Sequence, residues 1–162
     1  MDSRLEELPR RNGLRPKTKG PAPHRQVSQW PNTRDHAERL HEFAVSLPGV
    51  SSGLSHIGDG GLSAFFLADA VAQGWTPHFL IDNEFAHIHS DRSHSLHLVL
   101  PHELGVMLAD KGWTEQHPLS VAGTIPNTNF MLFGARKTEE FEVSKLVLMQ
   151  SWDFARKHRD AQ

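Results

Sequence analysis

The densest group of potentially reactive side chains lies just past the midpoint of the sequence, where four of the 12 histidines fall within eleven positions. These are His87, His89, His94 and His97. Imidazole is the commonest metal ligand in proteins, and it is the side chain whose ordinary pKa lies nearest to neutrality. The cluster therefore predicts either a metal centre or acid–base catalysis.

The spacing of the cluster is that of two antiparallel strands joined by a turn. Alternate side chains of a strand share a face, so His87 and His89 point the same way. A hairpin places His87 opposite His97 and His89 opposite Ser95, with Cβ atoms about 4.5 to 5.5 Å apart. His87, His89 and His97 are therefore the predicted metal ligands, and His94 falls in the turn.

The alternation of side chains along the strand assigns Phe85 and Glu84, two neighbours of these ligands, to opposite faces. Phe85 falls on the face of His87 and His89, whereas Glu84 falls on the opposite face. A bulge or the start of the strand would have to turn Glu84 round before it joined the site. Glu84 is therefore a weaker candidate than the histidines.

Two other interpretations fit the same histidines. In the first, the protein is a cofactor-free lyase, isomerase or cyclase, with His and Glu moving protons in an apolar pocket lined by Phe85, Trp113 and Phe130. In the second, it is a non-catalytic binding module whose histidines are structural or sense pH. Polar residues alternating with Leu, Ile and Val also describe an ordinary half-solvated sheet.

Composition limits the possible functions. A chain of 162 residues with 38% hydrophobic content fits one globular domain. The net charge of -2 predicts no nucleic-acid partner, and the absence of cysteine excludes disulfides, thiolate zinc sites and cysteine nucleophiles. A metal held by His and carboxylate suits Fe, Cu or Zn. We find neither a membrane span nor a leader peptide, so we expect a cytoplasmic protein with no membrane partner.

The first 30 residues are rich in proline and basic side chains and show almost no apolar periodicity. We interpret residues 1–30 as an extended arm and residues 31–162 as the folded domain. The arm is either solvated, or it docks through residues 23–26 on the domain or on a neighbouring subunit. The second arrangement allows a homodimer with contacts made by the arm.

The rest of the sequence predicts short strands and amphipathic helices. The expected helices are residues 32–47, 101–111 and 139–157, and the expected strands are residues 50–57, 62–67, 84–89, 95–100 and 129–134. The glycine-rich residues 58–61 predict a hairpin turn. This order predicts an α+β domain in which helices cover one face of a mainly antiparallel sheet, with the histidines on the other face or in a cleft at its edge.

A second pair of reactive side chains follows the helix expected at residues 101–111. Glu115 and His117 lie in a predicted loop, where catalytic groups are often held.

Five segments together resemble a known family. They are LPRRNGLRPKTKGPAPHRQ at 8–26, EFAHIH at 84–89, SLHLVLP at 95–101, GWTEQHP at 112–118 and the helix at 139–156. The combination is similar to small bacterial proteins of the luciferase family, and the resemblance spans residues 8–156. It draws attention to His24, Glu84, Glu115 and His117 as further site residues, and it implies that the loop of Glu115 and His117 forms a second wall of the cleft.

We therefore expect a metal-dependent enzyme that acts on a small organic molecule of specialised metabolism. Glu84 or His117 would complete the metal shell, and Glu115 would act as general acid or base or orient a ligand histidine. An open Fe or Cu site implies an oxidoreductase, and Zn implies a hydrolytic or lytic reaction.

Overall fold

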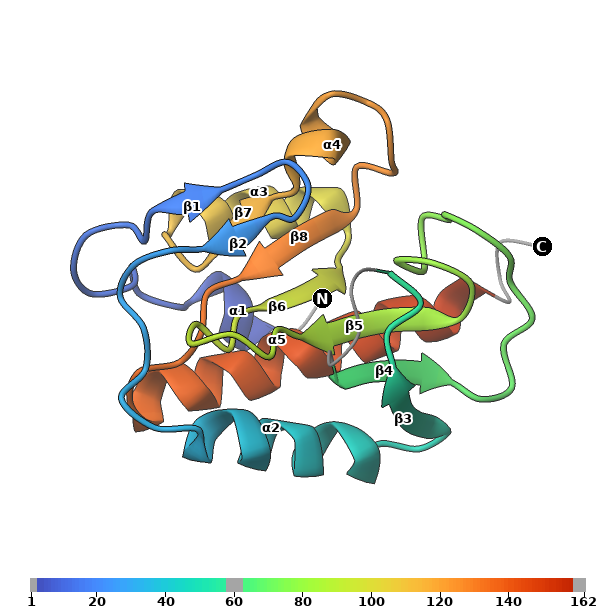
Figure 1. The fold of residues 1–162 in the computed structure, drawn as a ribbon, viewed down its shortest axis with the longest axis horizontal. Coiled ribbons are helices and arrows are strands. Elements are labelled where there is room, and N and C mark those ends of the chain that lie inside the picture. Colours follow the sequence, from blue (N-terminus) through green and yellow to red (C-terminus); the bar gives the residue numbers. More distant parts are fainter. Residues whose placement is uncertain (1–2, 58–62, 159–162) are drawn as a thin grey trace.

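The main sheet has six antiparallel strands in the computed structural model, which describes residues 3–57 and 63–158 (Figure 1). Their order across the sheet is β3 (Val50–Leu54), β4 (Ser63–Leu67), β5 (Glu84–Ile88), β6 (Leu96–Val99), β8 (Asn129–Leu132) and β7 (Thr114–Gln116). The glycine-rich turn expected at residues 58–61 lies outside the described residues.

Helices cover one face of this sheet. The long helix α5 (Thr138–Arg156) packs on β5 and β6, and α2 (Asp35–Ser46) packs on β3, β4 and α5. A third helix, α3 (His102–Asp110), packs against β7. The apolar stripes of these helices and the inward side chains of the strands form one core. The predicted α+β class is confirmed.

Most predicted elements appear with shorter ends, but one segment differs. The sequence predicts a loop after α3, whereas the structure has the edge strand β7 followed by the short helix α4 (Pro118–Val121). Strand β7 forms because Thr114, Glu115 and Gln116 pair with β8. Alternation over only three residues is too short to be recognised as a strand from sequence.

The register of four strands aligns the polar side chains. His87 pairs with His97, His97 pairs with Met131, and Met131 pairs with Glu115. Directly paired residues point to the same face of a sheet, so these four side chains form one row. The row lies on the face opposite to the helices, as the predicted arrangement requires.

A bulge corrects the expected orientation of Glu84 and Phe85. The pairing between β4 and β5 shifts so that Phe66 pairs with Glu84 and Phe85 has no partner residue. Glu84 is thereby turned to the face of His87, and Phe85 lies in the core beside Phe65, with ring centroids 6.4 Å apart. Parity counting predicts the reverse for both side chains because it assumes an unbroken strand.

The N-terminal segment lies against the domain and covers part of the histidine face. It contains the short helix α1 (Ser3–Glu6) and a hairpin of β1 (Thr18–Lys19) and β2 (Arg25–Gln26). Figure 1 shows the blue hairpin beside β8, away from α2 and α5. Leu5 is fully buried, and the Gln26 side chain accepts the backbone N–H of Gly134 at 3.0 Å. Of the arrangements considered for this segment, the structure has it docked on its own chain.

Three charged side chains fasten this segment to α5. Glu140 is 3% exposed and accepts hydrogen bonds from the backbone and guanidinium of Arg136. Arg11 lies 3.9 Å from the same carboxylate, and the guanidinium groups of Arg11 and Arg136 both donate to Gln29.

Among the helices of the described residues, none is long and apolar enough to cross a membrane.

Removing the charge of Glu140 should loosen this attachment. We expect Glu140→Gln to lower the free energy of unfolding by about 3 kcal/mol, because Arg11 and Arg136 lose their buried anion. Glu142→Gln on the exposed side of the same helix is the matched control and should cost less than about 0.5 kcal/mol. Urea denaturation measures both values, and equal losses would contradict the assignment.

The difference in unfolding free energy between the wild type and Glu140→Gln should become smaller in acid. Burial alone raises the pKa of Glu140, but hydrogen bonds from Arg136 and the charge of Arg11 outweigh it, so the pKa lies below 4.5. The stabilisation is present above the unfolded pKa and is lost as the pH falls through the lower folded value. A gap between wild type and Glu140→Gln that persists in acid would argue against this origin.

Candidate metal centre

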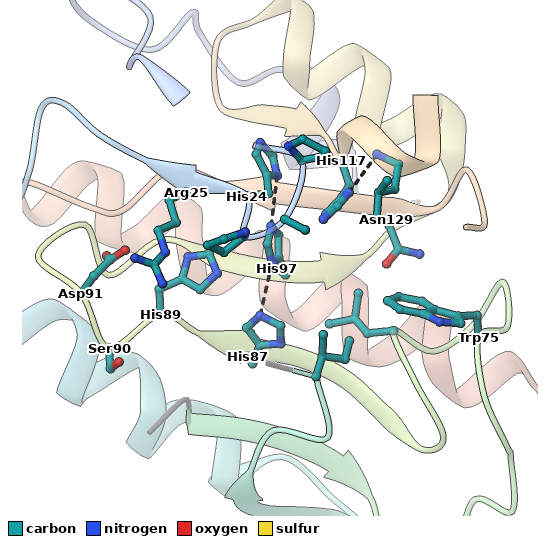
Figure 2. A pocket seen from close by; sticks show the side chains of 16 residues that line it. His24, Arg25, Trp75, His87, His89, Ser90, Asp91, His97, His117 and Asn129 are labelled. Atoms are coloured by element: carbon teal, nitrogen blue, oxygen red, sulfur yellow. Dashed lines mark hydrogen bonds between the residues drawn. The ribbon is translucent and has the colours of Figure 1, made fainter. Parts of the chain in front are cut away.

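Five histidines from separate segments surround one cavity of about 740 Å³. Figure 2 shows them around the opening. They are His24 from the loop between β1 and β2, His87 from β5, His89 just after β5, His97 from β6, and His117 just before α4.

A continuous series of contacts crosses the histidine face. Glu84 Oε1 lies 2.7 Å from His87 Nδ1, and His87 Nε2 lies 3.2 Å from His97 Nδ1. His97 Nε2 lies 3.1 Å from His24 Nδ1, and His24 Nε2 lies 2.8 Å from Glu115 Oε1. This imidazole series therefore holds three rings between two carboxylates, and Figure 2 draws its contacts between the rings.

The Glu84 carboxylate accepts hydrogen bonds at both oxygens. Its Oε2 accepts the backbone N–H of His56 at 2.8 Å, and its Oε1 accepts the hydroxyl of Ser55 at 2.8 Å. The Ser55 hydroxyl is free to donate because its oxygen accepts a backbone N–H. His87 must then donate its Nδ1 hydrogen to Glu84. A neutral His87 therefore presents the lone pair of Nε2 to His97.

At the other end of the series, Glu115 accepts the hydrogen of the terminal imidazole, as Glu84 does for His87. Burial alone raises the pKa of Glu115, but hydrogen bonds from His24 and Thr18 and the charges of His24 and Arg15 outweigh it and lower the pKa. An ionised carboxylate only accepts, so His24 donates its Nε2 hydrogen. A neutral His24 keeps its lone pair on Nδ1, facing His97.

If all three rings are neutral, the imidazole series is one hydrogen short. It has four contacts, but three neutral rings carry one N–H each and ionised carboxylates carry none. The two carboxylate contacts take one hydrogen each, because a lone pair facing an anion is repulsive. The hydrogen of His97 fills one of the two contacts between rings. In the other contact two nitrogen lone pairs then face each other, unless an extra proton on one of the rings or a metal ion lies there.

The hydroxyl groups of Ser93 and Ser95 determine which ring nitrogen of His89 carries the hydrogen. Ser93 Oγ donates to Asp91 Oδ1 at 2.5 Å, so it must accept from Ser95 Oγ at 2.9 Å. Ser95 Oγ then accepts from His89 Nδ1 at 2.8 Å. A neutral His89 therefore has its lone pair on Nε2.

The hydrogen-bonding role of His117 differs from that of the other histidines. Its Nδ1 accepts the backbone N–H of Leu119 at 3.1 Å and so caps α4. Burial, followed by the charges of His24 and His87, lowers the pKa of His117 to about 4. A neutral His117 therefore carries its hydrogen on Nε2 and has no lone pair there for an ion.

Burial also opposes an extra proton in the cluster. It is the largest cause, ahead of repulsion from neighbouring imidazoles, that lowers the pKa of His97 well below 6.5. Burial and the charge of His87 lower the pKa of His89 to about 3. Both rings are neutral at neutral pH.

Two groups of nitrogens among the described residues are close enough to share an ion. One ring nitrogen from each of His87, His89 and His97 lies within 4.8 Å of the others, and the same holds for His24, His97 and His117. The lone pairs favour the first group, because Nε2 of His117 carries a hydrogen. In the first group the hydrogen of His97 goes to His24, and all three rings have a lone pair to offer.

The structure brings most of the predicted site residues together. The predicted hairpin is confirmed, with His87 paired to His97 and the N–H of His89 donated to the carbonyl of Ser95. His94 lies in the turn with φ of 48°. His117 lines the cavity, whereas Glu84 and Glu115 lie behind the histidines and are not among its described lining residues.

The aromatic pocket expected for a cofactor-free enzyme is not formed by the residues named for it. Phe85 lies in the core, and the Trp113 indole donates to the carbonyl of Pro9. Phe130 packs so closely on α3 that a Cβ at Gly105 would lie 2.3 Å from its ring. None of the three is among the described residues that line the cavity, which is lined instead by residues such as Trp75, Leu80 and Leu119.

Sequence reasoning missed Asp91 and Ser93. Their only signal is the alternation Asp91, Ser93, Ser95, His97, which continues the parity of strand β6 back through the turn. The loop can approach β8 because residue 134 is glycine, where a Cβ would lie 1.8 Å from the carbonyl oxygen of Ser93.

Known proteins match this chain in sequence. The Luciferase domain family matches residues 82–149. Proteins called Luciferase from Armillaria gallica, Armillaria ostoyae and Armillaria mellea are each 30% identical to this chain over 165 residues. Each alignment covers 91% of this chain, which spans only 60% of the relative's length. No solved structure matches the chain.

The matched region contains His87, His89, His97, Glu115 and His117, whereas the N-terminal segment lies before it. The resemblance noted in the sequence is thereby confirmed. The chain contains a luciferase domain at residues 82–149.

Proposed function

We propose that this chain is a small-molecule enzyme in which His87, His89 and His97 bind a divalent transition metal ion. The observation that carries the proposal is that one ring nitrogen of each histidine lies within 4.8 Å of the other two, while each ring also has a nitrogen that contacts Glu84, Ser95 or His24. Metal-binding histidines have this arrangement, since the acceptor fixes both the tautomer and the orientation of the ring.

The distances support the same assignment. Nitrogens bound at about 2.0 to 2.1 Å to a tetrahedral ion lie about 3.3 Å apart. His87 Nε2 and His97 Nδ1 are 3.2 Å apart. The rings of His89 and His97 are nearly perpendicular, with centroids 4.6 Å apart, so they do not stack and could approach one ion from different directions.

The cavity supports a small organic substrate. Its volume of about 740 Å³ is within the usual range for small-molecule sites. Trp75, Leu80 and Leu119 supply apolar surface, and Asn129 and the Nε2 hydrogen of His117 supply polar groups. An ion held by these three protein ligands would keep a position open for a substrate atom. His117 would donate to an oxygen of the bound substrate.

Glu84 and Glu115 would position ligands rather than contact substrate. Glu84 orients His87 directly, and Glu115 acts through His24 on His97. The ligand set suits Fe, Cu or Zn. Bound Fe or Cu would supply redox chemistry and Zn would supply a Lewis acid. The name luciferase, which the relatives carry, favours the oxidative reaction.

Metal content after single substitutions tests the ligand assignment. We expect untagged wild-type protein to retain about one ion per chain, and His87→Ala and His89→Ala to lose it, since two imidazoles remain. His117→Gln should retain the ion, because His117 has no lone pair to offer. Inductively coupled plasma mass spectrometry measures the content, and circular dichroism checks that each variant is folded. Metal lost from His117→Gln but kept by His87→Ala would place the ion in the other group.

The hydroxyl row behind His89 gives a second test. Ser95→Ala removes the acceptor of the His89 Nδ1 hydrogen, so we expect the metal dissociation constant to rise roughly tenfold to a hundredfold. Ser144→Ala, which removes a similarly buried hydroxyl from α5, is the matched control and should leave the constant unchanged. Competition with a chelator of known affinity measures both constants. The same affinity in Ser95→Ala and Ser144→Ala would rule out a role for the row.

A further inference from the structure

His24 reaches the metal centre from a distant part of the sequence. It lies in the loop between β1 and β2, outside residues 82–149, yet its side chain is only 2% exposed. Its Nδ1 is 3.1 Å from His97 Nε2, and the two rings stack with centroids 5.2 Å apart. Figure 2 shows His24 on the far side of His97 from His87.

The other side of His24 is held by Glu115. His24 Nε2 donates to Glu115 at 2.8 Å, and strand β7 presents this carboxylate on the histidine face because Glu115 pairs with Met131. Gly20 lies against the ring, since a Cβ there would be 3.3 Å from it. The orientation of His24 is therefore fixed on several sides.

Arg15 anchors Glu115 and the N-terminal segment together. Its guanidinium donates to the backbone carbonyls of Ala109 and Thr114 and lies 3.5 Å from the Glu115 carboxylate. Side-chain contacts thus connect Arg15 at the surface to Glu115, then to His24, and finally to the predicted ligand His97.

His97 needs a partner that the sheet does not supply. His87 has Glu84 and His89 has Ser95, both from the same or the adjoining strand region. The nitrogen of His97 that faces away from His87 meets only His24 among the contacts described for it. Without His24, a buried N–H on this nitrogen would have no acceptor, which is costly.

We propose that the N-terminal segment is a working part of the metal centre, with His24 as a positioning residue that holds the Nδ1 lone pair of His97 toward the ion. The inference rests on the proposed function. Glu115 and Arg15 act through His24. Because an acceptor behind a ligand histidine typically changes metal affinity tenfold to a hundredfold, the loss of His24 should weaken binding without abolishing it.

Zinc binding to a set of variants tests this role. Isothermal titration with Zn²⁺, using a competing chelator, gives the stoichiometry and dissociation constant for the full chain. We expect His24→Phe, which keeps a ring but no acceptor, to retain one ion with an affinity roughly tenfold to a hundredfold weaker. His24→Asn, whose amide oxygen stands near the position of Nδ1, should recover part of this loss. Glu115→Gln should weaken binding less than His24→Phe.

The matched control is His102→Phe, the same replacement on α3, where the ring bonds the carbonyl of Asn127. It should bind Zn²⁺ like the wild type. Visible absorption of bound Co²⁺ separates positioning from general destabilisation, because it reports the ligand geometry: the band should shift in His24→Phe and not in His102→Phe.

Three results would overturn the inference. Wild-type affinity in His24→Phe would show that His97 needs no partner. Complete loss of the ion from His24→Phe, with His117→Gln also empty, would make His24 a ligand of the other group. A wild type that binds no Zn²⁺ or Co²⁺ would remove the proposed function itself, and this inference with it.

Discussion

The contact between His87 Nε2 and His97 Nδ1 is the constraint on which the site depends. Two carboxylates, one at each end, take the hydrogens of the outer rings, and the middle ring has only one hydrogen for two neighbours. Facing lone pairs are repulsive in a buried setting, and burial opposes a proton on His97, the middle ring. The proposed metal ion would remove the repulsion and use every lone pair.

The fold creates this arrangement through strand register. The pairing of β5, β6, β8 and β7 puts His87, His97 and Glu115 in one row, and the bulge at Phe85 adds Glu84 to the same face. Helices α2, α3 and α5 bury the opposite face and keep the sheet rigid. The N-terminal hairpin places His24 against His97 and Glu115. A segment outside the matched domain is therefore part of the site.

The sequence was sufficient for the local part of this site and insufficient for the long-range part. A period of two residues and one short turn place His87 against His97, so the hairpin could be predicted. Glu84 could not be placed, because a bulge depends on how β4 packs and leaves no local mark. His24 and Glu115 meet across 91 positions, and that contact depends on the docking of an irregular segment. The tautomers follow only from the complete set of partners.

Anomalous X-ray scattering at the absorption edge of the bound metal, in crystals of the full chain, would locate the ion. We expect one peak at about 2.0 to 2.2 Å from His87 Nε2, His97 Nδ1 and His89 Nε2, with His117 still capping α4 through Nδ1. A peak between His24, His97 and His117 would contradict it, as would metal-loaded crystals with no peak at the histidines.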